Sequence, residues 1–252
     1  MSESPAAISP STPPVPDDPV AAWLADPVDG AAFDAALGGA TGEALEAALR
    51  RLEDAAAQAG RGPVMSRALL LVGLRWRDTV RRTDRAEQVL QRAMAADPGA
   101  LKPIEEMARL LEDLGRFVDL AGMLEKLAAG TVEGAARALV LEKLGHLQDE
   151  KLAQSERALV NLLGAFRADP SRLGALRAAR AIHVRAARED LAKQLLDQEA
   201  DALRAGDPDE AQLAALADAY ADIAQALVTR PGQHAVGEDA ARRALTLVPG
   251  HP

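Results

Sequence analysis

The peptide AEQVLQRA at residues 86–93 leads into Asp97-Pro98, and the peptide ALVNLLGA at residues 158–165 leads into Asp169-Pro170. A shorter version, ARRAL at residues 241–245, precedes Val248-Pro249. In each copy, small and large apolar residues recur at the spacing of one face of an α-helix. Proline stops the helix, because it lacks an N–H donor and disfavours α geometry at the residue before it. This recurrence predicts stacked helical hairpins, each of which buries its apolar face only against its neighbours.

The composition supports an all-α fold. Of the 252 residues, 48% are hydrophobic and only 2% are aromatic, so Ala, Leu and Val must build the core. Small side chains of this kind favour closely packed helices, whereas sheets draw on β-branched and aromatic residues. We therefore expect helices throughout.

The net charge argues against nucleic acid as the partner. The chain carries a formal charge of -9, whereas phosphate binding depends on a basic surface. Two groups of arginine side chains stand out, and we interpret both as solvated helix faces with intrahelical ion pairs, since no aromatic residues accompany them. The two groups are Arg75, Arg77, Arg81, Arg82 and Arg85, and Arg172, Arg177, Arg180, Arg185 and Arg188.

Cysteine is absent, which excludes disulfides, thiolate chemistry and cysteine-bound zinc. The N-terminus has neither the basic start nor the apolar run of a secretory signal, and the longest apolar stretch, 68–74, is too short to cross a bilayer. The expected compartment is the cytoplasm.

The chain is expected to have three parts. Residues 1–19 form a Pro-, Ser- and Ala-rich leader without regular structure, residues 20–62 form short N-terminal helices that pack on the first repeat, and residues 63–252 form about five hairpins. Thr41 is a plausible N-cap, and Pro63 can open a helix in its first turn. The ten helices predicted for the hairpins are 63–82 with 84–96, 101–114 with 117–129, 132–150 with 154–168, 172–187 with 190–205, and 208–229 with 236–247.

The segment IEEMARLL at 104–111, followed by LGRF at 114–117 and LAGMLEKL at 120–127, resembles a tetratricopeptide repeat. That family places apolar and small residues along a first helix, a Gly-containing turn, then a second helix that often ends in proline. The resemblance covers residues 63–252 and implies a right-handed α-α superhelix of antiparallel helix pairs. The fourth hairpin departs from the pattern, because Gly206-Asp207-Pro208 replaces the terminal Asp-Pro.

The resemblance also implies a groove, lined by exposed positions of the first helices, that binds a peptide or protein segment. This lining would be mainly acidic, so it would favour a basic or amphipathic segment and weaken in salt. The alternative is that these residues are only the solvated sides of helices. The predicted lining residues are Lys102, Glu105, Glu106, Arg109, Glu112, Asp113, Glu142, Lys143, His146, Asp149 and Glu150.

No enzymatic motif is recognisable. The four histidines show no paired metal-ligand spacing, and the glycine pairs are better explained as helix stops, so we expect a noncatalytic protein without cofactor or metal. An alternative function is an accessory subunit that binds a small anion through Arg172, Arg177 and Arg180. The last predicted helix carries several small apolar residues without a polar cap, which predicts self-association, a partner contact there, or a longer parent chain.

Overall fold

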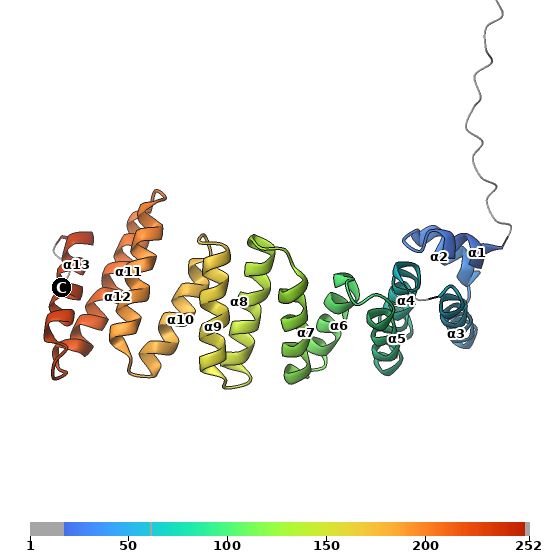
Figure 1. Ribbon diagram of the computed structural model, residues 1–252, viewed down its shortest axis with the longest axis horizontal. Coiled ribbons are helices and arrows are strands. Elements are labelled where there is room, and N and C mark those ends of the chain that lie inside the picture. The colour runs from blue at the N-terminus through green and yellow to red at the C-terminus, as the bar shows by residue number, and fades with distance from the viewer. Residues whose placement is uncertain (1–17, 61, 250–252) are drawn as a thin grey trace, which may run out of the picture. The chain divides into compact units, whose positions relative to one another are not determined.

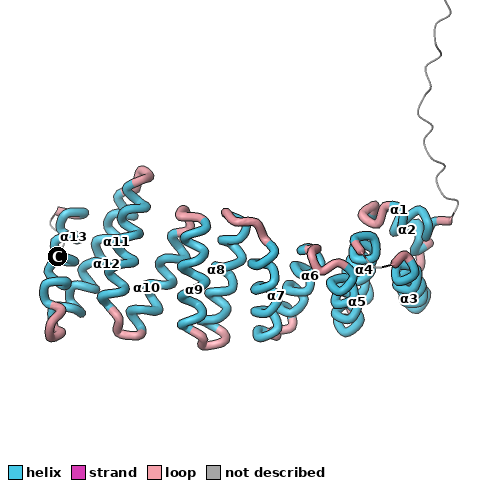
Figure 2. Tube along the Cα trace, viewed as in Figure 1, coloured by secondary structure: helices cyan, strands magenta, loops and turns pink. Residues whose placement is uncertain are grey.

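The computed structural model describes residues 18–60 and 62–249 (Figure 1). All regular secondary structure in these residues is helical, comprising thirteen α-helices and one π-helical segment (Figure 2). The chain divides into two compact units, Met1–Leu110 and Leu111–Pro252, which are described separately. The predicted leader lies outside the described residues except for Asp18 and Pro19, which cap and open the first helix.

Unit 1 begins with the three N-terminal helices that the sequence predicts. Asp18 and Asp29 cap the first two, since their side chains accept hydrogen bonds from the backbone N–H groups of Val20 and Ala31 at 3.0 and 2.9 Å. Gly38 ends the second helix with a φ of +63°, a left-handed conformation that glycine adopts without strain. The helices of unit 1 are α1 (Pro19–Ala25), α2 (Gly30–Leu37), α3 (Gly42–Gln58), α4 (Pro63–Arg75), η1 (Trp76–Val80), α5 (Thr83–Ala96) and the greater part of α6 (Leu101–Asp113).

The helix predicted for residues 63–82 is interrupted, which corrects the sequence-based expectation. The α-helical part ends at Arg75, and the next five residues form the wider turn of a π-helix. Arg81 then takes a φ of +63° and ends the segment. The first residue of the π-turn, Trp76, is fully buried, and its indole Nε1 donates a hydrogen bond of 2.7 Å to Glu53 on α3.

The core of unit 1 gathers the two tryptophans and several leucines. Trp23 and Phe33 pack with ring centroids 5.4 Å apart. Leu49 on α3, Leu69 on α4 and Leu90 on α5 are fully buried. These apolar contacts hold the short helices against the first hairpin.

Unit 2 consists of consecutive helix pairs, α8 with α9, α10 with α11, and α12 with α13, preceded by α7 (Figure 1). Two helices begin at least two residues later than predicted: α8 follows Gly134, whose φ is +114°, and α12 follows Asp209, which forms a capping box with Gln212. The helices are α7 (Phe117–Gly130), α8 (Ala135–Glu150), α9 (Ser155–Ala168), α10 (Leu173–Arg185), α11 (Glu189–Arg204), α12 (Glu210–Val228) and α13 (His234–Leu247).

Glycines allow the two helices of a pair to approach closely. A Cβ atom on Gly145 of α8 would lie 2.6 Å from Cγ of Leu162 on α9, and one on Gly237 of α13 would lie 2.9 Å from Val228. Leu162 belongs to one buried apolar cluster, and Tyr220 belongs to another that joins α11, α12 and α13. The predicted all-α fold of consecutive helix pairs is thus confirmed for the described residues.

Candidate peptide-binding face

The predicted lining residues of α8 bridge neighbouring first helices. Glu142 accepts a hydrogen bond of 2.5 Å from Nε of Arg172, just before α10. Asp149 accepts hydrogen bonds of 2.6 and 2.7 Å from Nη2 of Arg185, near the other end of α10. These ion pairs fasten α8 to α10 at two points.

Other predicted lining residues pair with the preceding first helix or within their own helix. Nζ of Lys143 donates to Glu112 at 2.5 Å, and His146 contacts Glu150 at 3.2 Å across one helical turn. Asp113 is exposed at the end of α6. Exposed pairs of this kind contribute little to stability, because water competes for the same charges.

The four predicted residues in unit 1 lie on α6, and one of them is not open to a partner. Glu106 is buried and accepts hydrogen bonds from Arg77 at 2.9 Å and from Arg109 at 2.8 Å. Lys102 pairs with Glu105 at 3.0 Å. Burial opposes ionisation of Glu106, but the surrounding cations outweigh it and hold the pKa of this carboxyl below its usual value.

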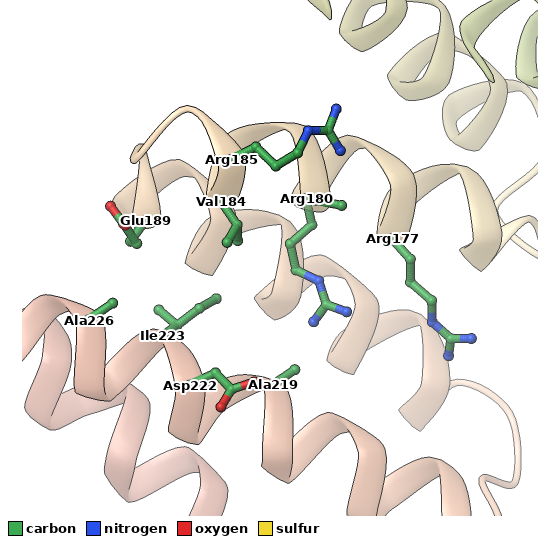
Figure 3. A pocket seen from close by; sticks show the side chains of 10 residues that line it. Arg177, Arg180, Val184, Arg185, Glu189, Ala219, Asp222, Ile223 and Ala226 are labelled. Carbon is green, nitrogen blue, oxygen red and sulfur yellow. The ribbon is translucent and has the colours of Figure 1, made fainter. Parts of the chain in front are cut away.

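A pocket opens between α10 and α12, two successive first helices of unit 2 (Figure 3). Its volume is about 480 Å³, within the range of roughly 300–1,000 Å³ that ligand pockets occupy. The apolar part of the wall comes from Val184 on α10 and from Ala219, Ile223 and Ala226 on α12. Ile223 is buried, whereas Val184 is 47% exposed at the rim.

Charged side chains surround this apolar wall, and most of them are already paired. Arg185 is turned away from the gap in Figure 3 and reaches Asp149. Glu189 accepts a hydrogen bond of 2.8 Å from Nη2 of Arg230. Asp222 lies on the α12 wall and is exposed.

Arg177 and Arg180 extend from α10 into the space beside α12 (Figure 3). Both turn toward Glu199, a buried carboxylate on α11: Nε of Arg177 donates to it at 2.5 Å, and Nη1 of Arg180 lies 3.7 Å away. Burial lowers the pKa of the Arg180 guanidinium, because desolvation disfavours its charged form.

The arginine set proposed for a small anion is therefore divided. Arg177 and Arg180 line the pocket, but Arg172 is paired with Glu142 and does not line it. Sequence reasoning missed the apolar residues of the pocket, Val184 and Ile223, because their spacing is that of the buried face of an ordinary helix. The available signal was the irregular end of the fourth hairpin, whose two helices carry Arg180 and Glu199.

One further titratable group on α10 is buried. His183 is buried on α10, and burial lowers the pKa of its imidazole. Across residues 18–60 and 62–249, no group of three or more histidine and acidic side chains is placed to hold a metal ion. Within the same ranges, no helix combines the length and the apolar character that a bilayer span requires.

No protein-family model matches the sequence, and no curated protein sequence matches it significantly. Among solved structures, the chain is similar to YrrB, described as a TPR protein with an unusual peptide-binding site, at 16% identity over 73% of this chain and 87% of that chain, with a TM-score of 0.45. It is also similar to MamA from Desulfovibrio magneticus RS-1, at 17% identity over 77% and 100% of the two chains, with a TM-score of 0.45. PilF of Pseudomonas aeruginosa matches at 14% identity over 93% and 94%, with a TM-score of 0.44. At these values the similarity transfers no function to this chain.

Proposed function

We propose that this chain is a noncatalytic protein-interaction module that binds an amphipathic peptide or protein segment on its first helices, with the pocket between α10 and α12 as the main anchor. The observation that carries the proposal is the pocket itself. It combines an apolar wall with polar side chains, opens to solvent, and is large enough for one or two apolar side chains of a partner.

The ion pairs of the first helices support this location. Arg172 and Arg185 fasten α8 to α10, whereas Arg177 and Arg180 turn to Glu199 on α11 and leave an apolar wall between α10 and α12. Apolar surface in a concave site supplies most of the energy of peptide binding, and a few polar groups fix orientation.

The wider acidic lining predicted from the sequence is proposed as a secondary contact. Its carboxylates at Glu142 and Asp149 are held by arginines, so the exposed Asp113 and Glu150 are the members best placed to meet a partner's cations. A contribution from them would weaken as salt is added, because exposed charges are screened. Substitution of Glu106 is unsuitable as a test, since this buried carboxylate holds Arg77 and Arg109.

The proposal is tested by selecting short random peptides on the full chain and measuring the affinity of the selected peptides by fluorescence anisotropy. The variants Val184→Asp and Ala219→Arg place a charge on the two walls of the pocket. Each should weaken binding at least about tenfold, since an apolar side chain of the peptide loses its buried site. Val118→Asp is the matched control, because Val118 is an exposed valine on α7.

Selected peptides that bind Val184→Asp and Ala219→Arg as tightly as the original chain would contradict the proposal. Loss of binding in Val118→Asp to the same extent would also contradict it, because the effect would then come from surface charge in general. Circular dichroism of each variant verifies that the helices are retained.

A small anionic ligand is the second candidate, favoured by the two guanidinium groups in the pocket wall. Citrate and inorganic phosphate are suitable probes, and calorimetric titration would detect either. Binding of citrate that is lost in Arg177→Gln, without any peptide binding that depends on Val184, would favour this second function.

A further inference from the structure

The most unusual charge arrangement beside the pocket is a pair of arginines that share one buried carboxylate. The Oε1 atom of Glu199 accepts a hydrogen bond from Nε of Arg177, while its Oε2 atom has no hydrogen-bond partner. The side chain of Arg180 is only 19% exposed, and its Nη1 atom forms an ion pair with this Oε2 atom at 3.7 Å, beyond hydrogen-bond distance. Buried donors in proteins are nearly always satisfied, so a guanidinium that lines the pocket and is too far from its own carboxylate for a hydrogen bond is suited to a further acceptor.

We propose that the pocket recognises an acidic residue, Asp or Glu, next to the apolar anchor of the bound segment. This inference rests on the proposed peptide-binding function and specifies the chemistry of the partner. The apolar side chain lies between Val184 and Ile223, and the neighbouring carboxylate pairs with Arg180 and with the outer nitrogens of Arg177. Guanidinium groups are suited to this task, because their planar donors match the two oxygens of a carboxylate.

The other charged side chains around Arg180 affect how tightly an acidic residue would bind. Arg185 and Glu189 are held by Asp149 and Arg230. Asp222 faces the pocket from α12 and attracts Arg180 electrostatically. It is therefore a competitor of the incoming carboxylate, and its removal should favour an acidic segment.

An acidic segment differs from the basic one expected from sequence. The carboxylates that would have attracted a basic segment on α8, Glu142 and Asp149, already hold Arg172 and Arg185. A partner's lysine or arginine would have to displace these ion pairs. A carboxylate at Arg180 displaces none of them and meets a guanidinium whose own partner, Glu199, lies beyond hydrogen-bond distance.

The test uses two peptide libraries in selections on the full chain. Both contain apolar residues at random positions, but the charged residues are only Asp and Glu in one and only Lys and Arg in the other. We expect the acidic library to yield the tighter peptides. In fluorescence anisotropy, Arg180→Gln should weaken these peptides about tenfold, the loss expected for a hydrogen bond to a charged group. Arg242→Gln, at an exposed arginine of α13, is the matched control and should leave the affinity unchanged.

Asp222→Asn gives a second test of opposite sign. This side chain is exposed, so the variant should fold normally, and it should tighten acidic peptides because a like charge is removed. Weaker binding of acidic peptides by Asp222→Asn, or unchanged binding by Arg180→Gln, would overturn the inference. Peptides that depend on Val184 but carry lysine or arginine would also overturn it and leave the proposed function standing. Peptides that do not depend on Val184 would refute both.

Discussion

Glu53 is the buried charge on which the packing of α3 against the first hairpin depends. Its carboxylate accepts hydrogen bonds from Nε1 of Trp76 at 2.7 Å, from Nη2 of Arg85 at 3.1 Å and from Nη1 of Arg92 at 3.1 Å. The substitution Glu53→Gln keeps the shape of the side chain and one acceptor oxygen. It removes the negative charge and places an amide NH₂ group before an arginine.

The expected cost follows from the exposure of the partners. Removal of one member of a fully buried ion pair destabilises by about 3–5 kcal/mol. Arg85 and Arg92 have side chains that are 31% and 40% exposed, so water can solvate both guanidinium groups after the charge is lost. With this discount, and with the tryptophan hydrogen bond retained, Glu53→Gln should lower the free energy of unfolding by about 2 kcal/mol.

Urea denaturation followed by circular dichroism measures this loss, and hydrogen exchange with mass spectrometry locates it. Repeat proteins open locally, so faster exchange should be confined to α3, η1 and α5 and should not extend to α12 and α13. Glu46→Gln is the control on the same helix, because Glu46 pairs with the exposed Arg50 at 3.0 Å. It should change stability by less than about 0.5 kcal/mol.

Equal losses in Glu53→Gln and Glu46→Gln would refute the reasoning, because burial would then make no difference. Faster exchange in unit 2 with none in α3–α5 would refute it as well. A stabilised Glu53→Gln would show that desolvation of the carboxylate outweighs its ion pairs.

Three further predictions concern packing, pH and capping. Gly145→Ala should destabilise the folded chain by about 1–3 kcal/mol in urea denaturation, because the new methyl group would overlap Leu162. Gly122→Ala on α7, where the new methyl group meets open space, should stabilise the chain by up to about 1 kcal/mol. Changes of the same sign in both variants would contradict this prediction. The pKa of Glu106 is lower in the folded chain than its usual 4.5, so its contribution to stability is complete above that pH and is lost as the pH falls through the folded value. Acid titrations of stability should therefore be shallower for Glu106→Gln than for the original chain, and identical slopes would exclude the effect. Asp209→Ala should lower the free energy of unfolding by about 1 kcal/mol and speed hydrogen exchange in the first turn of α12, because it removes the capping box. Unchanged hydrogen exchange in that turn would contradict this prediction.

The sequence predicted the helices well where a local signal ends them. Asp97 and Asp169 are the C-caps of α5 and α9, as expected from the prolines that follow. The starts of α8 and α12 were misplaced by two or three residues, because Gly134 and Asp209 were counted as helical. The π-turn at Trp76 had no local signal, since the contact of its indole with Glu53 joins residues far apart in the chain.

The site was predictable only in part. Sequence spacing reveals pairs within a helix, such as Lys102 with Glu105. It does not reveal that Glu142 pairs with Arg172, thirty residues away, so the charges of α8 were read as free when they hold α10. Arg177 and Arg180 were identified as a possible anion site, but the apolar wall that accompanies them depends on how α10 and α12 pack.

The bridges from α8 to α10 have a consequence for any binding experiment on unit 2. The Arg185–Asp149 pair lies at the surface, where dissolved ions reach it as easily as they reach a bound peptide. Raising the ionic strength will therefore weaken this ion pair between α8 and α10 while it also weakens the complex. A steep dependence of the affinity on salt then reflects the packing of the two hairpins as well as the charge of the ligand. Affinities should therefore be compared at one ionic strength, with variants that keep the Arg185–Asp149 pair, so that the packing of α8 against α10 stays constant.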